Sequence, residues 1–309
     1  MVDLKDSSRN YLKGIKKMPR GVIVRVVGGL FYVKDGEKLI KTTASGKLRD
    51  YRKIPVAGDY VNYEVTNENE GYIKSIETRK NQLIRPPGAN IDQAIVVTSL
   101  VEPDFSSLLL DKLLVQILDN NIKPIIYFSK MDKVKSIKEY ETYFNYYKSI
   151  GFDVFVGNSL SKENISEIKD LIKGKVSIVT GQSGAGKSTL LNSFSKDLNL
   201  KTGDFSSSLG RGKHTTREVE FLEVCDGLIA DTPGFSSMEL DIDSERLAYV
   251  FPGFEEEGLN CKFRGCLHES EPGCRIKELV EDGNILKESY DNYLKLLEAV
   301  KARKVVYKK

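Results

Sequence analysis

The residues from Gly181 to Ser188 have the types and spacing needed to hold the phosphates of a nucleotide. They match the pattern G-x-x-x-x-G-K-S/T, and an apolar run at 176–180 predicts the strand that should precede it. Glycines let backbone N–H groups point inward around a phosphate, at a helix N-terminus whose dipole favours an anion. We expect Lys187 to neutralise the β- and γ-phosphates during catalysis, and the hydroxyl of Ser188 to bind Mg²⁺. The predicted phosphate-binding residues are Gly181, Gln182, Ser183, Gly184, Ala185, Gly186, Lys187, Ser188 and Thr189. A glycine-rich connection without a ligand is the alternative, which the flanking strand and helix disfavour.

A second motif, Asp231-Thr-Pro-Gly234, follows another apolar run at 227–230. A carboxylate at a strand end can reach the shell of a Mg²⁺ ion, and the backbone N–H of Gly234 can sense a γ-phosphate. Alone, D-x-P-G is a common turn. Downstream of a phosphate loop it supports a nucleotide site that includes Asp231 and Gly234.

Between the two motifs, residues 208–217 form a glycine-rich and basic segment. A threonine in this segment could complete the Mg²⁺ shell, closing only when a γ-phosphate is present. Thr215 and Thr216 are both candidates, and the sequence does not choose between them. A solvated surface loop describes the ground state of this segment equally well.

Upstream, an apolar run at 124–128 leads into Ser129-Lys130-Met131-Asp132. This tetrad resembles the guanine-reading N-K-x-D motif of GTP-binding proteins. In that role Asp132 accepts hydrogen bonds from two guanine donors that adenine lacks, and Lys130 lays its stem along the base. An unpaired buried carboxylate costs ~1–3 kcal/mol, so such a contact discriminates between bases. Ser129 stands where asparagine is usual, and we expect its shorter side chain to brace this loop less well against the phosphate loop.

The order of these motifs differs from the ordinary one. GTPases usually have the phosphate loop first and the base-reading loop last, whereas here the base-reading residues come first. After a further predicted strand at 152–156, Asn158 and Ser159 occupy the place of the last guanine-contacting loop and complete the expected nucleotide-binding set. The arrangement indicates a circularly permuted GTPase, which is physically tolerable because chain termini lie at the surface and often close together.

A third group of reactive residues is Cys261-x4-Cys266-x-His268-x5-Cys274. Three thiolates and one imidazole make a full tetrahedral set for Zn²⁺, and a site with no open position is structural. The metal would then fold a segment too polar to form a core. Four unrelated residues in a loop are the alternative, which is disfavoured because three of the four cysteines and one of the two histidines fall here. We expect Cys225, which stands alone, to be a buried small apolar residue.

Two patterns of predicted elements must position the nucleotide-binding residues. Residues 21–85 contain five short β-rich runs separated by glycine-containing turns, which suits a barrel of the oligonucleotide-binding (OB) type, with another small packing barrel as the alternative. Strands and helices then alternate, which predicts a parallel sheet covered on both faces. The runs of the barrel are 21–27, 30–33, 38–42, 59–65 and 71–76; the later strands are 91–100, 124–128, 152–156 and 176–180; the later helices are 106–119, 136–150 and 161–172.

Together these patterns predict a multidomain fold. It combines an N-terminal five-stranded OB-type β-barrel, a central α/β permuted phosphate-loop GTPase domain and a C-terminal helical zinc-binding module. The predicted division is a basic arm at 1–20, the barrel at 21–85, the GTPase domain at 86–241 and the zinc-binding helical domain at 242–309, with a linker at 85–88.

Composition limits the remaining classes. Of 309 residues, 40% are hydrophobic and 29% are charged, which excludes a fully disordered or fibrous chain. The net charge of +3 comes from 47 basic and 44 acidic residues, so any nucleic-acid binding must rest on local patches. We expect a cytoplasmic protein with no membrane partner, because no apolar leader opens the chain and no window reaches ~18 consecutive apolar residues.

Basic residues surround the metal cluster and close the chain. They could contact RNA phosphates, and a solvated charged surface is the equally open alternative. These residues are Lys262, Arg264, Arg275, Lys277, Lys301, Arg303, Lys304, Lys308 and Lys309.

The small barrel, the permuted core and the metal cluster, over about residues 20 to 280, resemble the RsgA family of bacterial GTPases. The phosphate loop 181–188, the stretch Arg211-Gly-Lys-His-Thr-Thr216, Asp231–Gly234 and the cluster carry the resemblance, and Ser129 departs from it. The resemblance implies a monomer that hydrolyses GTP with Mg²⁺, strongly stimulated by the small ribosomal subunit. It also implies that the barrel and the zinc module grip ribosomal RNA, and that hydrolysis is coupled to late maturation of the subunit.

One residue of the expected catalytic set rests on both chemistry and resemblance. Phe235 follows Asp231–Gly234 where many GTPases carry a water-orienting glutamine, and a phenyl ring cannot orient water by hydrogen bonding. His214 can donate or accept a proton near neutral pH, and we predict that it takes this role. A solvated histidine without a role is the alternative.

Two other functions stay open from the sequence. One is a metabolic phosphotransferase or ATPase built on the same loop, which Asp132 and the D-x-P-G motif disfavour. The other is a nucleotide-gated RNA-binding checkpoint factor whose hydrolysis is incidental.

Overall fold

The computed structural model divides into two compact units, Met1–Thr78 and Arg79–Lys309. The residues it describes are 18–44, 46, 48, 54–84, 87–157, 162–194, 219–231 and 239–303. None of the helices among these residues is long and apolar enough to cross a membrane.

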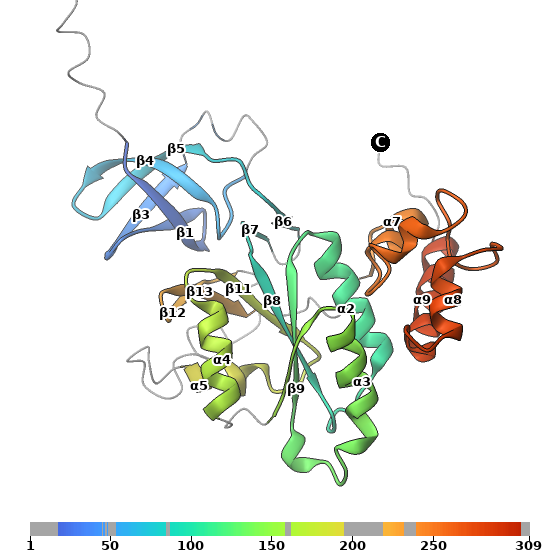
Figure 1. Ribbon diagram of the computed structural model, residues 1–309. Helices are drawn as coiled ribbons and strands as arrows, with labels where there is room; N and C mark the ends of the chain where they lie inside the picture. The colour runs from blue at the N-terminus through green and yellow to red at the C-terminus, as the bar shows by residue number, and fades with distance from the viewer. Residues whose placement is uncertain are drawn as a thin grey trace, which may run out of the picture. The chain divides into compact units, whose positions relative to one another are not determined.

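The first unit is a closed five-stranded barrel with strand order β1-β2-β3-β5-β4 (Figure 1). Its strands are β1 (Arg20–Val27), β2 (Leu30–Asp35), β3 (Lys38–Ala44), β4 (Tyr60–Asn67) and β5 (Glu70–Ile76). Strands β3 and β5 pair in parallel and the other neighbours are antiparallel. Alternate side chains point inward and form one core: Ile23, Phe31, Val33, Ile40, Val61, Tyr63 and Ile73. Gly28 and Gly29 have φ of 56° and 81°, left-handed values that explain a glycine pair in the turn from β1 to β2. The predicted five-stranded barrel is therefore confirmed.

The second unit is built on a six-stranded sheet with strand order β10-β9-β8-β11-β13-β12 (Figure 1). Its strands are β8 (Gln93–Ser99), β9 (Lys123–Ser129), β10 (Asp153–Val156), β11 (Val176–Gly181), β12 (Leu222–Val224) and β13 (Gly227–Asp231). All neighbours are parallel except β12 and β13. The predicted parallel sheet is confirmed, and β12 was missed because three residues carry too little pattern.

Helices cover both faces of this sheet. They are α2 (Ser107–Asp119), α3 (Lys138–Ser149), α4 (Lys162–Ile172) and α5 (Lys187–Phe194). Residues from α4 and α5, among them Ile168 and Phe194, form one buried cluster with sheet residues such as Val97 and Val179. Helices α2 and α3 lie on the opposite side of the sheet (Figure 1). Burial on both faces explains why β8, β9 and β11 are almost continuously apolar.

Residues 79–84 belong to the second unit, although the linker was expected at 85–88. Strand β6 (Gln82–Leu83) precedes that linker and pairs with β7 (Gly88–Ala89), which begins at the linker's last residue. The side chain of Asn81 accepts a hydrogen bond from the backbone N–H of Ile91 at 2.8 Å and donates one to its carbonyl at 2.7 Å. These contacts hold the segment before the linker against the start of the sheet domain.

The C-terminal residues form helices that pack on α2. They are α7 (Ser244–Val250), the 3-10 helix η4 (Glu257–Asn260), α8 (Arg275–Glu281) and α9 (Lys287–Ala302). Their core is aromatic: the rings of Phe251, Phe254 and Tyr293 lie with centroids 4.8 to 5.2 Å apart. The expected helical module is thus present and, among the described residues, forms one unit with the sheet domain.

A buried polar network joins α9 to α2. The carboxylate of Asp111, fully buried, accepts hydrogen bonds from Tyr147 at 2.7 Å, Asn292 at 2.9 Å and Ser289 at 3.2 Å. Asn292 also donates to the hydroxyl of Ser107 at 3.0 Å. Because such bonds have directional requirements that apolar contacts lack, the network fixes how α9 is rotated and translated on α2.

Candidate nucleotide site and zinc site

The expected nucleotide-binding residues that the structure describes lie at one edge of the sheet. Neighbouring strands place Ser129 beside Ser99, and Asp231 beside Val179, which lies two residues before Gly181. Since these strands are parallel, their carboxyl ends all face the same side, where ligands of α/β sheets bind. The base-reading loop, the phosphate loop and the D-x-P-G motif therefore start from the same edge.

The phosphate loop has the backbone conformation its glycines predict. Gly184 and Gly186 have φ of 79° and 99°, and a Cβ on Gly181 would lie 2.0 Å from the carbonyl oxygen of Val97. Lys187 is the first residue of α5, and its ammonium donates 2.8 Å hydrogen bonds to the carbonyls of Gly181 and Gln182. The loop thus gathers a cation and a helix N-terminus at one point, which is the environment that phosphate oxygens require.

Ser129 joins the base-reading loop to the phosphate loop. Its hydroxyl, 1% exposed, donates a hydrogen bond of 2.6 Å to the carbonyl of Ala185 and also lies 3.3 Å from the carbonyl of Thr98. We expected the short side chain to brace the two loops less well. The structure shows instead that serine makes the contact directly, because the end of β9 lies close to the phosphate loop.

Lys130 and Asp132 lie on the open side of the same loop. Lys130 has φ of 60°, which reverses the chain before the 3-10 helix η1 (Met131–Lys133). Its ammonium donates to the carbonyl of Glu102, and the ammonium of Lys133 lies 2.8 Å from the Glu102 carboxylate, whose pKa it lowers by hydrogen bonding. Met131 and Asp132 are exposed, so both side chains are accessible to a base. Glu102 gave no sequence signal, because its role depends on where the loop after β8 folds.

Asp231 is a buried carboxylate at the end of β13, 7% exposed. A hard oxygen ligand in this position suits Mg²⁺. Six of the expected site residues lie outside the described part of the chain, and their roles stay predictions. They are Asn158, Ser159, His214, Thr215, Thr216 and Gly234.

The four predicted zinc ligands do meet in space. One donor atom from each of Cys261, Cys266, His268 and Cys274 lies within 4.8 Å of the others. The sulfurs of Cys261 and Cys274 are 4.0 Å apart, and each lies 3.5 Å or less from Nδ1 of His268. Zinc–sulfur bonds of ~2.3 Å in a tetrahedron separate two sulfurs by about 3.8 Å, so the set fits Zn²⁺.

The electrostatics of the cluster also favour a cation. Burial raises the pKa of Cys266 to about 12 and raises the pKa of Cys274, and the charge of Cys261 adds to both shifts. Burial lowers the pKa of His268, which keeps its imidazole neutral as a ligand must be. Three thiolates in one buried place need a compensating divalent charge, and Zn²⁺ supplies it when bound.

Hydrogen bonds from neighbouring residues hold the four candidate zinc ligands in place. The carboxylate of Glu271 accepts hydrogen bonds from the backbone N–H groups of Leu267 and Glu269, both at 2.9 Å, and so folds the turn between the ligands. The hydroxyl of Tyr290 donates to the carbonyl of His268 at 2.7 Å. Such partners fix the orientation of metal ligands. The spacing of the ligands could not reveal these hydrogen-bond partners, because Tyr290 lies on α9, outside the segment that holds the ligands.

A parallel α/β sheet whose base-reading loop precedes its phosphate loop defines a circularly permuted GTPase domain, here linked to a β-barrel and a Cys3His module. Comparisons agree with this class. The model of the RsgA GTPase family matches residues 76–241, and that of the RsgA N-terminal domain matches residues 20–73. The chain belongs to the RsgA family and is a GTPase.

Named relatives are similar over nearly the whole chain. Small ribosomal subunit biogenesis GTPase RsgA from Geobacillus sp. (strain WCH70) is 46% identical, and that from Bacillus subtilis (strain 168) is 44% identical. Each match covers 94% of this chain and 100% of the relative. The crystal structure of YloQ, a circularly permuted GTPase, matches with a TM-score of 0.80 at 40% identity, over 94% of this chain and 97% of that one. YjeQ from Thermotoga maritima matches with a TM-score of 0.81 at 31% identity, over 93% and 99%.

Proposed function

We propose that this GTPase binds the small ribosomal subunit and couples GTP hydrolysis to its late maturation or to the release of assembly factors. The observation that carries the proposal is the 46% identity to a small ribosomal subunit biogenesis GTPase over that protein's full length. The match covers barrel, GTPase domain and metal cluster together. Similarity in the nucleotide-binding domain alone would not justify the inference of a shared partner.

At the nucleotide, each residue has a distinct role. Asp132 reads the base, and Lys130 covers it. Lys187 neutralises the β- and γ-phosphates, and Mg²⁺ adds charge neutralisation when it binds with GTP. Ser188, Asp231 and one of Thr215 and Thr216 hold that ion, which leaves the γ-phosphate to be sensed by the backbone of Gly234. The remaining nucleotide contacts are assigned to Asn158, Ser159 and the other residues of the phosphate loop.

The attacking water needs a partner that Phe235 cannot provide. His214 supplies a nitrogen that accepts or donates a proton near neutral pH. It belongs to the basic segment between the phosphate loop and D-x-P-G, and ribosomal RNA positions it when the subunit is bound. Hydrolysis is then slow in the free protein and fast on the subunit, in a protein that acts as a cytoplasmic monomer.

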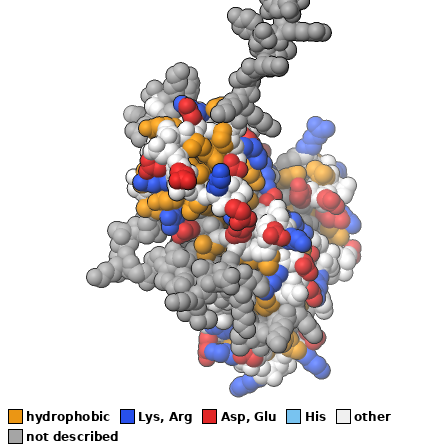
Figure 2. All heavy atoms as spheres, turned by 90° about the vertical axis from the view of Figure 1, so that its left-hand side faces the viewer, with side chains coloured by type: hydrophobic (Ala, Val, Ile, Leu, Met, Phe, Trp, Pro, Cys, Tyr) orange, Lys and Arg blue, Asp and Glu red, His pale blue; other side chains and the backbone are white. Residues whose placement is uncertain are grey.

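The barrel and the zinc module are proposed to contact ribosomal RNA. On the barrel face shown in Figure 2, basic side chains alternate with acidic and hydrophobic ones rather than forming one cationic field. Individual arginine–tyrosine pairs are better suited to bind RNA. The guanidinium of Arg25 lies 4.1 Å from the ring centre of Tyr32, and that of Arg20 lies 4.3 Å from the ring centre of Tyr60. An arginine held on a ring offers both a charge to phosphate and a stacking surface to a base.

The test is the initial rate of GTP and ATP hydrolysis, measured alone and with purified small or large ribosomal subunits. We expect slow GTP turnover alone and a many-fold rise only with small subunits. Equal use of ATP would contradict the assignment of Asp132 to guanine. Absence of stimulation by small subunits would contradict the proposed partner.

A further inference from the structure

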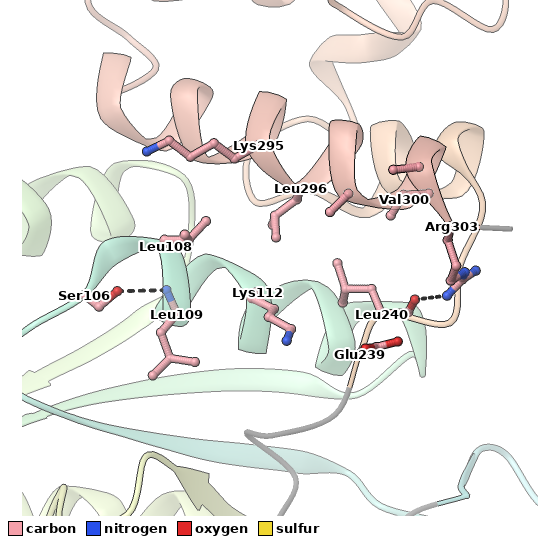
Figure 3. Close-up of a pocket in the computed structure, with 12 residues that line it drawn as sticks. Ser106, Leu108, Leu109, Lys112, Glu239, Leu240, Lys295, Leu296, Val300 and Arg303 are labelled. Carbon is pink, nitrogen blue, oxygen red and sulfur yellow. Dashed lines mark hydrogen bonds between the residues drawn. The ribbon is translucent and has the colours of Figure 1, made fainter.

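A groove of about 620 Å³ lies between α2 and α9. Its floor is apolar, with Leu108 from α2, Leu296 from α9 and Leu240 from the chain between them pointing into the gap (Figure 3). Leu240 and Leu296 keep 8% of their surfaces exposed, and Ala299 is exposed at the edge. The groove is thus a shaped apolar surface that side chains of a partner could enter.

Cations line the walls of the groove. Lys112 belongs to α2 and Lys295 to α9, and neither ammonium has an ion-pair partner among the residues the structure describes. Arg303 adds a third cation, which forms an ion pair with Asp241 at 3.5 Å, and Glu239 is the one acidic side chain among the described residues that line the groove. The local charge is therefore positive, although the charges of the whole chain nearly balance.

The wall formed by residues 239 and 240 links the groove to the nucleotide site. This segment continues the chain from Asp231-Thr-Pro-Gly234. Arg303 fixes it to the end of α9, because its guanidinium donates to the carbonyl of Leu240 and, at 3.0 Å, to that of Ile242 (Figure 3). A ligand of the groove would touch the chain that leaves the phosphate-sensing motif.

The side chains that line the groove favour one kind of occupant over the others. None of the described residues that line the groove is aromatic, so among them there is no stacking surface for an RNA base. The C-terminal residues of this chain, 304–309, carry three lysines and would be repelled by the same cations. A protein segment with leucine-like side chains on one face and carboxylates on the other matches both the floor and the walls.

We propose that this groove docks an acidic amphipathic segment of a protein on the small ribosomal subunit. The inference rests on the proposed function, since that function supplies the subunit, and adds to it a protein contact next to the phosphate-sensing motif. Carboxylates of the segment pair with Lys112 and Lys295, and its apolar side chains cover Leu240 and Leu296.

The test places a photo-crosslinking benzophenone amino acid at Ala299 of the full chain. The variant is bound to purified small subunits with a non-hydrolysable GTP analogue, irradiated, and the crosslinked peptides are identified by mass spectrometry. The same probe at Glu281, exposed at the end of α8 and outside the groove, is the control. We expect Ala299 alone to crosslink to an acidic, leucine-containing segment of one subunit protein.

Charge reversal makes the test quantitative. In the Lys112→Glu and Lys295→Glu double variant we expect the crosslink yield at Ala299 to fall about tenfold, since like charges then face each other. Lys148→Glu, a reversal at an exposed lysine of α3, should leave the yield unchanged. Crosslinks to RNA only, to residues 304–309 only, or with equal yield in the double variant would overturn the proposal.

Sedimentation with subunits and stimulated GTP hydrolysis are measured on the same samples. Normal sedimentation and stimulation without a crosslink at Ala299 would overturn the groove proposal and leave the proposed function standing. Loss of both in the unsubstituted protein would overturn the proposed function, and the groove proposal with it.

Discussion

The hydroxyl of Ser129 donates a 2.6 Å hydrogen bond to the carbonyl of Ala185, and so ties the proposed base-reading loop to the proposed phosphate loop. The two residues are 56 positions apart in the sequence. Ser129 is the last residue of β9, and Ala185 lies in the phosphate loop at the same edge of the sheet. A movement of either loop is therefore transmitted to the other. Base recognition and phosphate binding should respond together when this bond is removed.

Ser129→Ala tests that coupling. The change leaves the buried carbonyl of Ala185 without its partner, at a cost of ~1–3 kcal/mol. We expect GDP and GTP affinity to fall by about fivefold or more, measured by titration with fluorescent analogues. Ser129→Asn, which restores an amide donor, should recover most of the affinity. Equal affinity of the alanine variant and the unsubstituted protein would contradict the coupling.

Lys187→Ala removes the cation of the phosphate loop. We expect GTP turnover to fall about 100-fold or more, because Lys187 is the lysine that the phosphate-loop motif assigns to the β- and γ-phosphates. The thermal unfolding curve should change little, since the hydrogen bonds of the ammonium to the carbonyls of Gly181 and Gln182 stay within its own loop. Lys148→Ala is the matched control. A Lys187→Ala variant that still supports subunit maturation would favour a checkpoint in which hydrolysis is incidental.

His214→Ala separates water activation from nucleotide binding. General acid–base groups contribute ~10²–10⁴-fold to rates, so subunit-stimulated GTP turnover should fall by that order. GTP affinity should stay nearly unchanged, because the phosphate and base contacts remain. Stimulated rates equal to those of the unsubstituted protein would remove His214 from the mechanism.

The cluster around His268 should hold one zinc ion per chain, measured by elemental analysis of the purified protein. Cys266→Ser removes a buried ligand, and we expect loss of zinc and a lower unfolding temperature of the C-terminal helices. Cys225→Ser is the control, since Cys225 packs against the sheet core far from the other cysteines in sequence. Retention of zinc in Cys266→Ser, or equal loss in both variants, would argue against the site.

Asp111 gives the α2–α9 contact a pH dependence. Burial raises the pKa of its carboxyl to about 7, against the lowering effect of its hydrogen bonds to Asn292, Tyr147 and Ser289. The folded state then holds a proton that the unfolded chain releases near pH 4, so the stabilisation is full below about pH 4 and declines as pH rises through 7.

Urea unfolding of the unsubstituted protein and Asp111→Asn at pH 5 and pH 8 measures this effect. The free energy of unfolding of the unsubstituted protein, relative to that of Asp111→Asn, should fall by about 1–3 kcal/mol from pH 5 to pH 8, since the amide does not titrate. The same difference in stability at both pH values would show that the carboxyl does not exchange a proton in this range.

The parts of the site that sequence predicts well are those contained in one short segment. The phosphate-loop motif occupies 181–188 and the four residues that could hold a metal lie within 261–274, so spacing alone points to both. The strands and helices follow in the same way from local apolar periodicity, and most of their observed ends agree with the predicted ones within a few residues.

What the sequence does not show are contacts between distant segments. The hydrogen bond from Ser129 to Ala185 depends on how close the two loops come in the folded sheet. From the residue type alone, we expected serine to brace the loops less well than asparagine. Asp111 and Asn292 meet across 181 positions, and neither stands in a motif. Such pairs depend on tertiary packing, which propensity and periodicity do not encode.

The strand order also bears on synthesis of the chain. The central strand β8 pairs with β9 on one side and with β11 on the other, and β9 is made first. A chain that emerges from its N-terminus can therefore pair β8 with β9 and form the base-reading loop before any phosphate-binding residue exists. The residues from Asp132 to Gly181 must still be synthesised before the chain can bind phosphate. In a nascent chain of this protein, nucleotide capture is thus delayed until the sheet is more than half built, whereas the ordinary motif order would offer the phosphate loop first.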